Sequence, residues 1–507
     1  MGIIIRQSVK GTIVNYIGTL IGMFTTLFVL AKFLSQEEIG LTRAFIDAGV
    51  LFAGLAQIGT NASIFRFFPY FKNSENNNNG FFFWTIILPF IGFCFYLIVF
   101  LLLKNNITIF FSKESELFVN YFYFIIPLGF FLLYQTVFET NSVVLQRVVV
   151  PSFVREVGIR LMLLVSYFLF AYDYITLTTL IITICFTYFT AAAINLGYLF
   201  YLGKISLKPK FHYPSKKLKK EFLFYTLFLM ASALTTAIVP TLGSFYITAK
   251  LGLAFTGVYT IAKYIATLID IPYRSLGAIS SPHISQTLKD KDFTQTNRLI
   301  KKISLHQFLI GTVVFFVIWS NIDLIFQFIP NGDSFAAGKW VVFFLGLTSL
   351  LNTSLVSGAT TLSFSKYYYY SLLFTFILTT SVLILNVLYV PKWGITGAAL
   401  AQLSSYFLYF LLLLSLVFWK LKVIPLSWKH LKILFIILIL FGLDALWKHF
   451  ITASIFHDTD VNRWISALEA VVRTAVLGGL GFLCVYSWKI SEEVNGLLQM
   501  KKNNASN

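Results

Sequence analysis

Long apolar stretches constrain this chain more than any other feature of its sequence. Stretches of about 20 apolar residues, the length of an α-helix that crosses a bilayer, recur along all 507 residues and are separated by short polar segments. About fourteen spans are predicted, at 11–34, 41–65, 81–104, 119–140, 152–171, 176–202, 222–249, 255–281, 303–329, 338–361, 367–390, 394–419, 430–449 and 464–488. The sequence therefore predicts an all-α polytopic membrane protein.

Composition agrees with this interpretation. Hydrophobic residues make up 57% of the chain and charged residues only 12%, whereas soluble domains carry about 25% charged residues. The first apolar stretch is longer than the apolar core of a cleavable signal peptide, so we expect none. Cys94, Cys185 and Cys484 each lie inside an apolar stretch, and we expect neither a disulfide framework nor a zinc site.

The basic residues predict the orientation in the membrane. Of the 39 lysines and arginines, 26 fall in loops on the side of the N-terminus and eight in the opposite loops. Because basic loops stay in the cytoplasm, both termini are predicted to be cytoplasmic, which requires an even number of spans. The net charge of +18 is thus explained by topology, and no nucleic-acid partner is needed.

The longest polar connection divides the chain. We predict an N-terminal lobe of six helices (1–203), a basic cytoplasmic linker (204–221), a second lobe of six helices (222–420), and two further helices with a cytoplasmic tail (421–507). The two lobes look related, since residues 31–52 align with 248–269 at a shift of 217, which pairs Gly40 with Gly257. Duplicated lobes with a site between them are typical of transporters.

Charged residues inside the predicted spans indicate a hydrated cavity. A charge at mid-membrane costs about 2.5–3.5 kcal/mol on insertion scales and needs a partner or water. A helix turns by 100° per residue. One face of the second predicted helix therefore carries Arg43, Asp47, Gln57 and Asn61, and one face of the eighth carries Lys263, Asp270 and Arg274. This cavity would be net cationic and would suit an anionic headgroup such as a diphosphate. Two alternatives are open: Arg43 and Arg274 reach the membrane interface by snorkelling, or Arg43 with Asp47, and Asp270 with Arg274, are self-neutralising i,i+4 pairs.

The remaining intramembrane charges have more ordinary explanations. Glu156 with Arg160, Asp444 with Lys448, and Glu469 with Arg473 have i,i+4 spacing and are expected to be structural pairs, although Arg160 can also face the cavity. No cofactor is expected. Coupling to a proton or sodium gradient is open, with three candidate carboxylates: Asp47, Asp270 and Glu139.

Three motifs resemble a known family. Residues 31–41 (AKFLSQEEIGL) resemble the A-R-x-L-x-P-E-E-x-G signature of polysaccharide exporters, with Lys32 in place of the usual Arg and Gln36 in place of the usual Pro. Residues 59–66 (GTNASIFR) and 391–401 (PKWGITGAALA) resemble two further motifs of that family. It is part of the multidrug, oligosaccharidyl-lipid and polysaccharide (MOP) flippase superfamily.

The resemblance implies a fold and a function. It implies two six-helix lobes of the MATE type, alternating access, and transport of undecaprenyl-diphosphate-linked oligosaccharides for O-antigen, capsule or exopolysaccharide across the bacterial inner membrane. It makes Arg66, which matches the family's Arg at the cytoplasmic end of the second helix, a candidate contact for the diphosphate. Polysaccharide polymerase and chain-length proteins are expected partners, together with membrane lipids.

Other functions remain open at this point. A peptidoglycan lipid-precursor flippase would also have fourteen spans and a basic cavity, whereas a multidrug extruder would favour twelve spans and an acidic cavity. A membrane polysaccharide polymerase or ligase would be an enzyme with a long outer loop. The longest outer loops expected here, 105–118 and 450–463, have only about fourteen residues, which favours a transporter.

Overall fold

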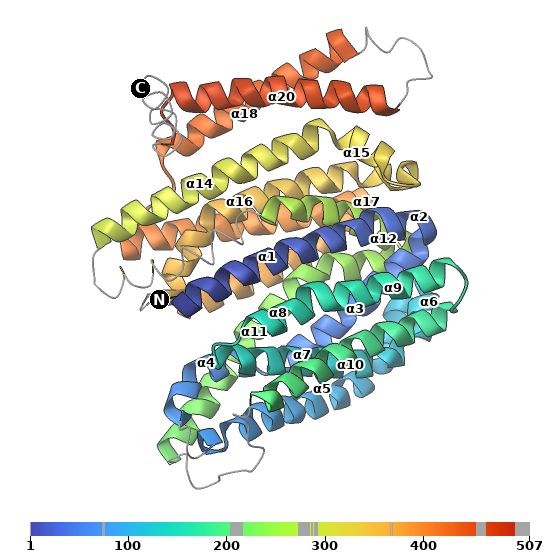
Figure 1. Ribbon diagram of the computed structural model, residues 1–507, viewed down its shortest axis with the longest axis vertical. Helices are drawn as coiled ribbons and strands as arrows, with labels where there is room; N and C mark the ends of the chain where they lie inside the picture. Colours follow the sequence, from blue (N-terminus) through green and yellow to red (C-terminus); the bar gives the residue numbers. More distant parts are fainter. Residues whose placement is uncertain are drawn as a thin grey trace. The chain divides into compact units, whose positions relative to one another are not determined.

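The computed structural model describes residues 2–72, 77–202, 216–271, 284, 287, 293–365, 367, 369–452 and 463–491. Every regular element in this part of the chain is a helix (Figure 1). Ten helical stretches within it are long and apolar enough to cross a bilayer. The predicted class, an all-helical protein with many membrane spans, is therefore confirmed.

Each predicted span is largely helical where the structure describes it. The four spans beyond those ten are 152–171, 222–249, the described part of 255–281, and one of the two spans within the 53-residue helix α17 (Tyr369–Leu421). The total of fourteen crossings remains a prediction. The predicted basic linker lies partly outside the described residues, since residues 203–215 are not described.

The chain forms two compact units, residues 1–261 with 375–398 and residues 262–374 with 399–507, and each is described by itself. Unit 1 contains α1 (Gly2–Phe24), η1 (Thr25–Leu30), α2 (Ala31–Phe33), α3 (Gln36–Ala56), α4 (Thr60–Phe71), η2 (Asn77–Gly80), α5 (Phe81–Ser112), α6 (Glu116–Asn120), η3 (Phe122–Phe124), α7 (Ile125–Val144), α8 (Val149–Phe153), η4 (Val154–Gly158), α9 (Ile159–Ala171), α10 (Leu177–Tyr201), α11 (Lys216–Lys250) and the first part of α12 (Leu253–Thr267). Unit 2 contains the rest of α12, η5 (Leu268–Asp270), α14 (Phe293–Ser320), α15 (Ile322–Phe328), η6 (Gly332–Gly338), α16 (Lys339–Phe364), α18 (Trp428–Trp447), η7 (Lys448–Thr452) and α20 (Arg463–Ser487). Helix α17 is divided between the units. These units are defined by packing, and the predicted six-plus-six division remains a prediction.

Helix α7 organises unit 1, where it packs against α3, α4, α5 and α10 (Figure 1). In unit 2, α14 packs against α16 and α18, and α18 packs against α20. The outward surfaces are apolar: within the stretch 78–112, around α5, a window of 18 residues has a mean hydropathy of 2.9, and only 17% of that window is buried within the protein. A helix that is apolar on all sides and mostly uncovered is stable only in lipid.

A glycine divides α17 into two spans. At 1.5 Å per residue, 53 helical residues would extend about 80 Å, more than twice the apolar thickness of a bilayer. Gly394 interrupts the helix with φ 56° and ψ −137°, a conformation that side chains disfavour. A Cβ atom on Gly397 would lie 2.3 Å from the carbonyl oxygen of Tyr389, so the chain turns back tightly. The motif at 391–401 thus encodes a turn between two spans.

The motif at 31–41 encodes a helix start. Ser35 is the N-cap of α3 and forms a capping box with Glu38, whose carboxylate accepts a hydrogen bond from the Ser35 backbone N–H at 2.8 Å. Gln36 therefore occupies the first helical position, where proline is also favoured because its missing N–H has no helical partner there. The replacement of the usual Pro by Gln36 leaves this start intact.

The two glycines paired by the sequence repeat contact each other's helix reciprocally. A Cβ atom on Gly40 would lie 2.0 Å from the carbonyl oxygen of Leu253, and one on Gly257 would lie 2.1 Å from that of Gln36. The shift of 217 that relates Gly40 to Gly257 also relates Gln36 to Leu253. The same contact is thus made twice, as expected for two equivalent segments around a local two-fold axis. This observation supports the predicted duplication.

Candidate functional site

The predicted site residues fall on several helices. In unit 1, Arg43 and Asp47 lie on α3, Asn61 and Arg66 on α4, Glu139 on α7 and Arg160 on α9, and Gln57 is the C-cap of α3. Lys263 on α12 and Asp270 in η5 belong to unit 2, and both are half-buried. Arg274 lies outside the described residues. The predicted cationic cavity, which depends on Lys263 and Arg274, therefore remains a prediction.

The second predicted span is not one continuous helix. Helix α3 ends at Ala56 and α4 begins at Thr60, because Ile58 (φ 48°) and Gly59 (φ 71°) both have left-handed backbone conformations. Gly59 adopts this conformation without steric cost. The prediction that Gln57 and Asn61 continue the line of Arg43 and Asp47 along one helix is therefore wrong. Gly59 in the motif at 59–66 is the residue that permits the break.

Arg43 and Asp47 form a two-pronged ion pair on α3. The Nη2 and Nε atoms of Arg43 lie 2.9 and 3.1 Å from the two carboxylate oxygens of Asp47. The Asp47 side chain is 4% exposed, whereas that of Arg43 is 36% exposed. Burial of the carboxylate is compensated by this bidentate geometry, which is the strong form of such a pair. The i,i+4 pairing that the sequence left open is thus present.

Three buried tyrosines surround this pair. Tyr167 on α9 and Tyr188 on α10 interact electrostatically with Arg43, and Tyr259 on α12 interacts with Asp47. Tyr167 also lies close to Thr42. Hydroxyl dipoles in a low-dielectric interior can follow a change in the charge of the pair. The Arg43–Asp47 pair therefore lies among buried polar side chains of unit 1.

A second chain of charges joins α7 to the η4–α9 segment. Arg155 pairs with Glu139 through Nη1 and with Glu156 through Nε at 3.0 Å. Arg160 pairs with Glu156 at 3.0 Å, as its i,i+4 spacing predicts, and Gln135 donates a hydrogen bond to Glu139 at 3.2 Å. Glu139, named as a candidate ion-coupling residue, is thus held by a cation sixteen residues away in sequence.

Tyr188 lies near both sets of charges, close enough to Arg43, Asp47 and Arg160 for their charges to act on its hydroxyl group. We call the six charged residues the unit 1 network: Arg43, Asp47, Glu139, Arg155, Glu156 and Arg160. Three acids and three bases make it formally neutral. Spare polar atoms accompany it, since Arg160 Nη1, Asn141 Oδ1 on α7 and both side-chain polar atoms of Asn195 on α10 are buried with no hydrogen-bond partner in the described part of the chain.

The segment that carries Arg155 and Glu156 is a π-helix. Such wide turns are rare and often mark functional positions, because the extra residue re-aims neighbouring side chains. Helix α1 packs directly on this segment, and a Cβ atom on Gly18 would lie 2.3 Å from the carbonyl oxygen of Glu156. Helix α1 itself continues into a second π-helix, η1. The periodicity of apolar residues in the sequence reveals neither π-helix. It also misses the Glu139–Arg155 pair, because the two residues lie on separate helical segments.

Arg66 is held at the surface of unit 1. It is exposed, and its guanidinium lies 4.0 Å from the centre of the Tyr225 ring on α11. Nearby, the hydroxyl groups of Ser63 and Thr226 lie 2.7 Å apart. The Arg66 side chain remains open to a ligand while the Tyr225 ring fixes its position.

Two other predicted site residues, Gln57 and Asn61, are only partly buried.

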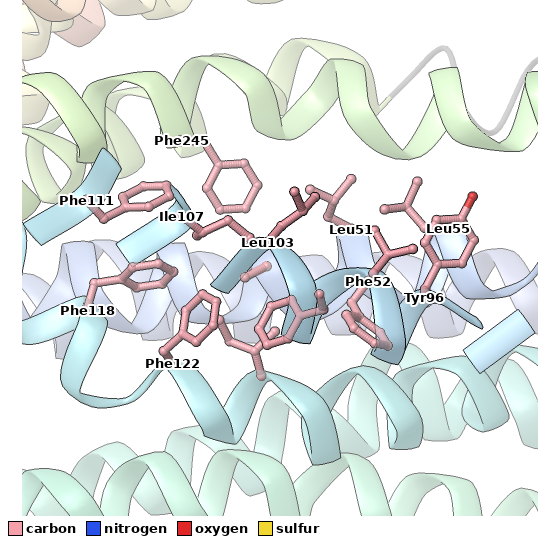
Figure 2. Close-up of a pocket in the computed structure, with 14 residues that line it drawn as sticks. Leu51, Phe52, Leu55, Tyr96, Leu103, Ile107, Phe111, Phe118, Phe122 and Phe245 are labelled. Carbon is pink, nitrogen blue, oxygen red and sulfur yellow. The ribbon is translucent and has the colours of Figure 1, made fainter. Parts of the chain in front are cut away.

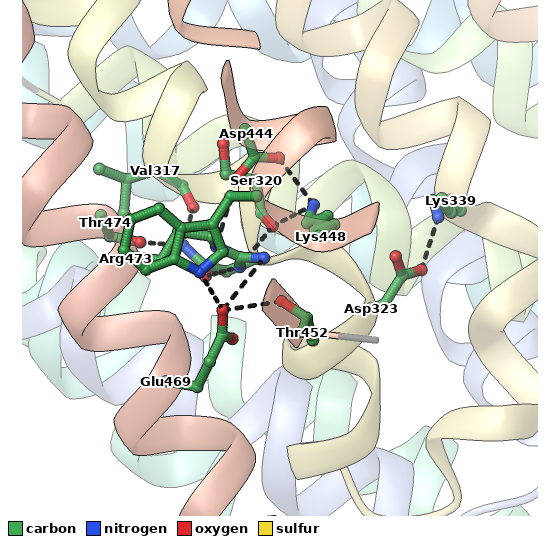
Figure 3. Close-up of polar contacts among 12 residues, drawn as sticks. Val317, Ser320, Asp323, Lys339, Asp444, Lys448, Thr452, Glu469, Arg473 and Thr474 are labelled. Atoms are coloured by element: carbon green, nitrogen blue, oxygen red, sulfur yellow. Dashed lines mark hydrogen bonds and ion pairs between the residues drawn. The ribbon is translucent and has the colours of Figure 1, made fainter. Parts of the chain in front are cut away.

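Unit 2 has a charged network of its own, which joins α18 and α20 to the end of α14 (Figure 3). Asp444 pairs with Lys448 at 2.8 Å and with Arg473 at 3.3 Å. Arg473 lies 3.9 Å from Glu469 and donates a hydrogen bond to the Ser320 carbonyl at 3.1 Å. We call these four charged residues the unit 2 network. Both i,i+4 pairs predicted on these helices are present.

Comparison with known proteins covers most of the chain. The sequence model of one family, described as "Polysaccharide biosynthesis protein", matches residues 8–288. Among solved structures, the chain is similar to the lipid II flippase MurJ in an inward closed conformation, with 15% identity, a TM-score of 0.68, and coverage of 94% of this chain and 99% of MurJ. No curated protein sequence matches the chain.

Two other solved structures share the fold. One is an inward-facing multidrug resistance MATE transporter of the MOP superfamily, with 17% identity and a TM-score of 0.58 over 80% of this chain and 95% of that one. The other is a MOP-superfamily transporter from Pyrococcus furiosus, described as having a binding pocket of reverse polarity, with 16% identity and a TM-score of 0.56 over 83% and 96%. At these identities the likeness concerns the fold alone.

Proposed function

The chain belongs to the polysaccharide biosynthesis protein family, and from that membership we propose that it flips undecaprenyl-diphosphate-linked oligosaccharide units from the cytoplasmic to the periplasmic leaflet. It is a multi-pass membrane protein with the MOP-superfamily transporter fold. The observation that carries the proposal is the family match over residues 8–288. The units would serve O-antigen, capsule or exopolysaccharide synthesis.

The proposed mechanism is alternating access between the two predicted lobes, 1–203 and 222–420. Lys263, Arg274 and Arg43 bind the diphosphate, since ammonium and guanidinium groups pair well with phosphate oxygens. Arg66 meets the diphosphate at the cytoplasmic end, and Gln57, Asn61 and Arg160 contact the headgroup or its sugars. The excess of basic residues on one side supports an orientation with both termini in the cytoplasm of the bacterial inner membrane.

The Arg43–Asp47 pair supports a link between substrate and coupling ion. A diphosphate that binds the Nη2 and Nε atoms of Arg43 leaves Asp47 without its counterion. The Asp47 side chain is only 4% exposed. A buried carboxylate in that state gains a proton or a sodium ion. In this mechanism Asp47 couples an ion gradient to substrate binding, and Glu139 and Asp270 are the other carboxylates able to do so.

Deletion of the gene tests the cargo. We expect undecaprenyl-diphosphate oligosaccharide to accumulate on the cytoplasmic leaflet, and Lys263→Ala combined with Arg274→Ala to abolish export at normal protein levels. Lipid-linked units that reach the outer leaflet unpolymerised would instead point to a polymerase or ligase. Rescue of a strain depleted of its peptidoglycan precursor flippase, with no effect on other surface sugars, would replace the proposed cargo with that precursor.

A further inference from the structure

An elongated apolar slot runs along one face of α5 in unit 1 (Figure 2). On α5 its wall extends from Tyr96 to Phe111, fifteen residues or about 22 Å at 1.5 Å per residue. Ala48, Leu51 and Leu55 of α3 form the facing wall. The cavity volume is about 290 Å³. Its length and narrow walls match an extended hydrocarbon chain better than a compact ligand.

The chemistry of the slot is that of hydrocarbon. Its fourteen lining side chains are aliphatic or aromatic, and Tyr96 contributes their one hydroxyl group. Its rim continues into the lipid-facing surface, because Leu101, Leu102 and Leu103 of α5 are 48%, 77% and 46% exposed. A chain that enters the slot therefore comes from the bilayer, and it exchanges one apolar environment for another with tighter packing.

Two lysines lie beside the slot, Lys104 near the middle of the α5 wall and Lys250 near its Phe111 end. The Lys104 ammonium lies 4.7 Å from the centre of the Tyr123 ring, and the Lys250 ammonium lies 5.1 Å from that of Phe110. Each ring belongs to a residue next to one that lines the slot, Phe122 or Phe111. The exposed acids of the same loop, Glu114 and Glu116, form no ion pair with these lysines in the described part of the chain.

The Phe111 end of the slot is closed. The Ser115 hydroxyl donates a hydrogen bond to the Thr248 carbonyl at 2.6 Å, which fastens the loop after α5 to α11. A Cβ atom on Gly252 would lie 3.0 Å from the carbonyl oxygen of Glu114, so the loop and the α11–α12 turn are in direct contact. A chain that lies in the slot would therefore end near this loop, with its headgroup outside on the side of Lys104 and Lys250.

We propose that the slot binds one acyl chain of an anionic phospholipid, whose phosphate pairs with Lys104 and Lys250. Basic residues near the membrane surface attract anionic lipid headgroups, and the aromatic rings hold the ammonium groups in place. Under the proposed topology the lipid belongs to the outer leaflet. The site is independent of the cargo. It would hold α3, α5 and α11 together from their lipid-facing side.

Photo-crosslinking tests the site in full-length protein reconstituted in vesicles. Phosphatidylglycerol with a diazirine in its acyl chain should label peptides of α5 and α3 that line the slot. Val99→Trp and Ala48→Phe, which fill the slot from opposite walls, should each lower this labelling at least fivefold. Leu102→Trp, on the exposed lipid-facing side of α5, should leave it unchanged. Elution as a single folded species confirms that each variant is intact.

The headgroup is tested with the same label on phosphatidylcholine. Lys104→Gln combined with Lys250→Gln should lower labelling by phosphatidylglycerol at least threefold and leave the weaker labelling by phosphatidylcholine unchanged. Equal labelling by both lipids in the unmodified protein would overturn the assignment of the headgroup. Undiminished labelling of both Val99→Trp and Ala48→Phe would show that the acyl chain does not bind in the slot. Preferential labelling by a polyprenyl phosphate that carries the diazirine would replace the phospholipid with a polyprenyl lipid.

Discussion

Each unit contains a network of carboxylates with arginine or lysine on membrane helices, and the two networks differ in how tightly they are enclosed. In unit 2 the side chains of Arg473 and Asp444 are 4% and 7% exposed, although that of Lys448 is 36% exposed. In unit 1 all three cations are partly exposed, with Arg43 at 36%, Arg155 at 44% and Arg160 at 30%. The same i,i+4 pairs occur in both. A buried arginine, Arg473, therefore distinguishes the unit 2 network from the unit 1 network.

The networks also differ in their hydrogen bonds. Lys448 donates to the Ser320 carbonyl at 2.7 Å, Arg473 donates to the same carbonyl at 3.1 Å, and Glu469 accepts hydrogen bonds from Trp447 and Thr452, each at 2.9 Å. In unit 1, Arg155 is shared between two glutamates on separate helical segments. Both networks contain buried polar atoms without a hydrogen-bond partner in the described part of the chain, among them Arg160 Nη1 in unit 1 and Asp444 Oδ1 in unit 2. Cations bonded to the backbone of a neighbouring helix fix that helix, whereas partly exposed arginines that bond only to side chains can be rearranged. We therefore expect mutations in unit 2 to lower stability and mutations in unit 1 to lower transport.

The largest expected effect is that of Arg473→Ala. It leaves Asp444 and Glu469 buried with Lys448 as their remaining cation, and breaking such a buried pair costs about 3–5 kcal/mol. Thermal unfolding in detergent and the yield of folded protein measure the loss. Arg463→Ala, at the exposed start of the same helix, should change stability by less than about 0.5 kcal/mol. Equal stability of the two variants would mean that the unit 2 network is no anchor.

Gly18→Ala should have the next largest effect, because it pushes α1 away from the π-helix of the unit 1 network. The new methyl group would overlap the Glu156 carbonyl, and overpacking of this kind costs about 1–3 kcal/mol. Gly478→Ala on α20 is the matched control, since nothing lies within 4 Å of its added Cβ. There alanine should stabilise the helix by about 0.5–1 kcal/mol. Thermal unfolding of both variants decides whether the α1–η4 contact is tight.

The sequence predicts what depends on local spacing. Apolar stretches of about 20 residues located the spans, and i,i+4 spacing located the Arg43–Asp47, Glu156–Arg160 and Asp444–Lys448 pairs. The shift of 217 residues even paired two glycines that pack reciprocally. In each case one helix, or one repeated helix start, contains the whole pattern.

Features that depend on packing between helices escaped prediction. Glu139 and Arg155 lie sixteen residues apart on separate helical segments, so their pairing is set by how α7 and the η4–α9 segment pack. The break at Ile58 and Gly59 interrupts a run of 25 residues (41–65) that is long enough to form one span. A glycine at 59 permits a left-handed conformation but does not require one, and therefore the sequence alone favoured a continuous helix.

Glu139→Gln sharpens the comparison by separating activity from stability. The amide cannot balance the charge of Arg155, but Glu156 still pairs with that half-exposed arginine at 3.0 Å. We expect stability to fall by less than about 1 kcal/mol, as for partly solvated pairs, and export of lipid-linked sugar to fall at least tenfold. Asp444→Asn should show the opposite pattern, a loss of folded protein with normal export per folded molecule. If both variants lost stability alike, the contrast between the networks would disappear.

Arg66→Gln provides the lower end of the scale, because Arg66 belongs to neither network. It is exposed and held over Tyr225, a cation–π contact worth about 0.5–1 kcal/mol at such a site. Tyr225→Phe preserves the ring and is the matched control. If Arg66 contacts the diphosphate, Arg66→Gln lowers export severalfold while Tyr225→Phe does not, and both keep their thermal stability within about 1 kcal/mol. If both variants export normally, Arg66 is a surface anchor, and the charges that matter for transport lie deeper in the helices.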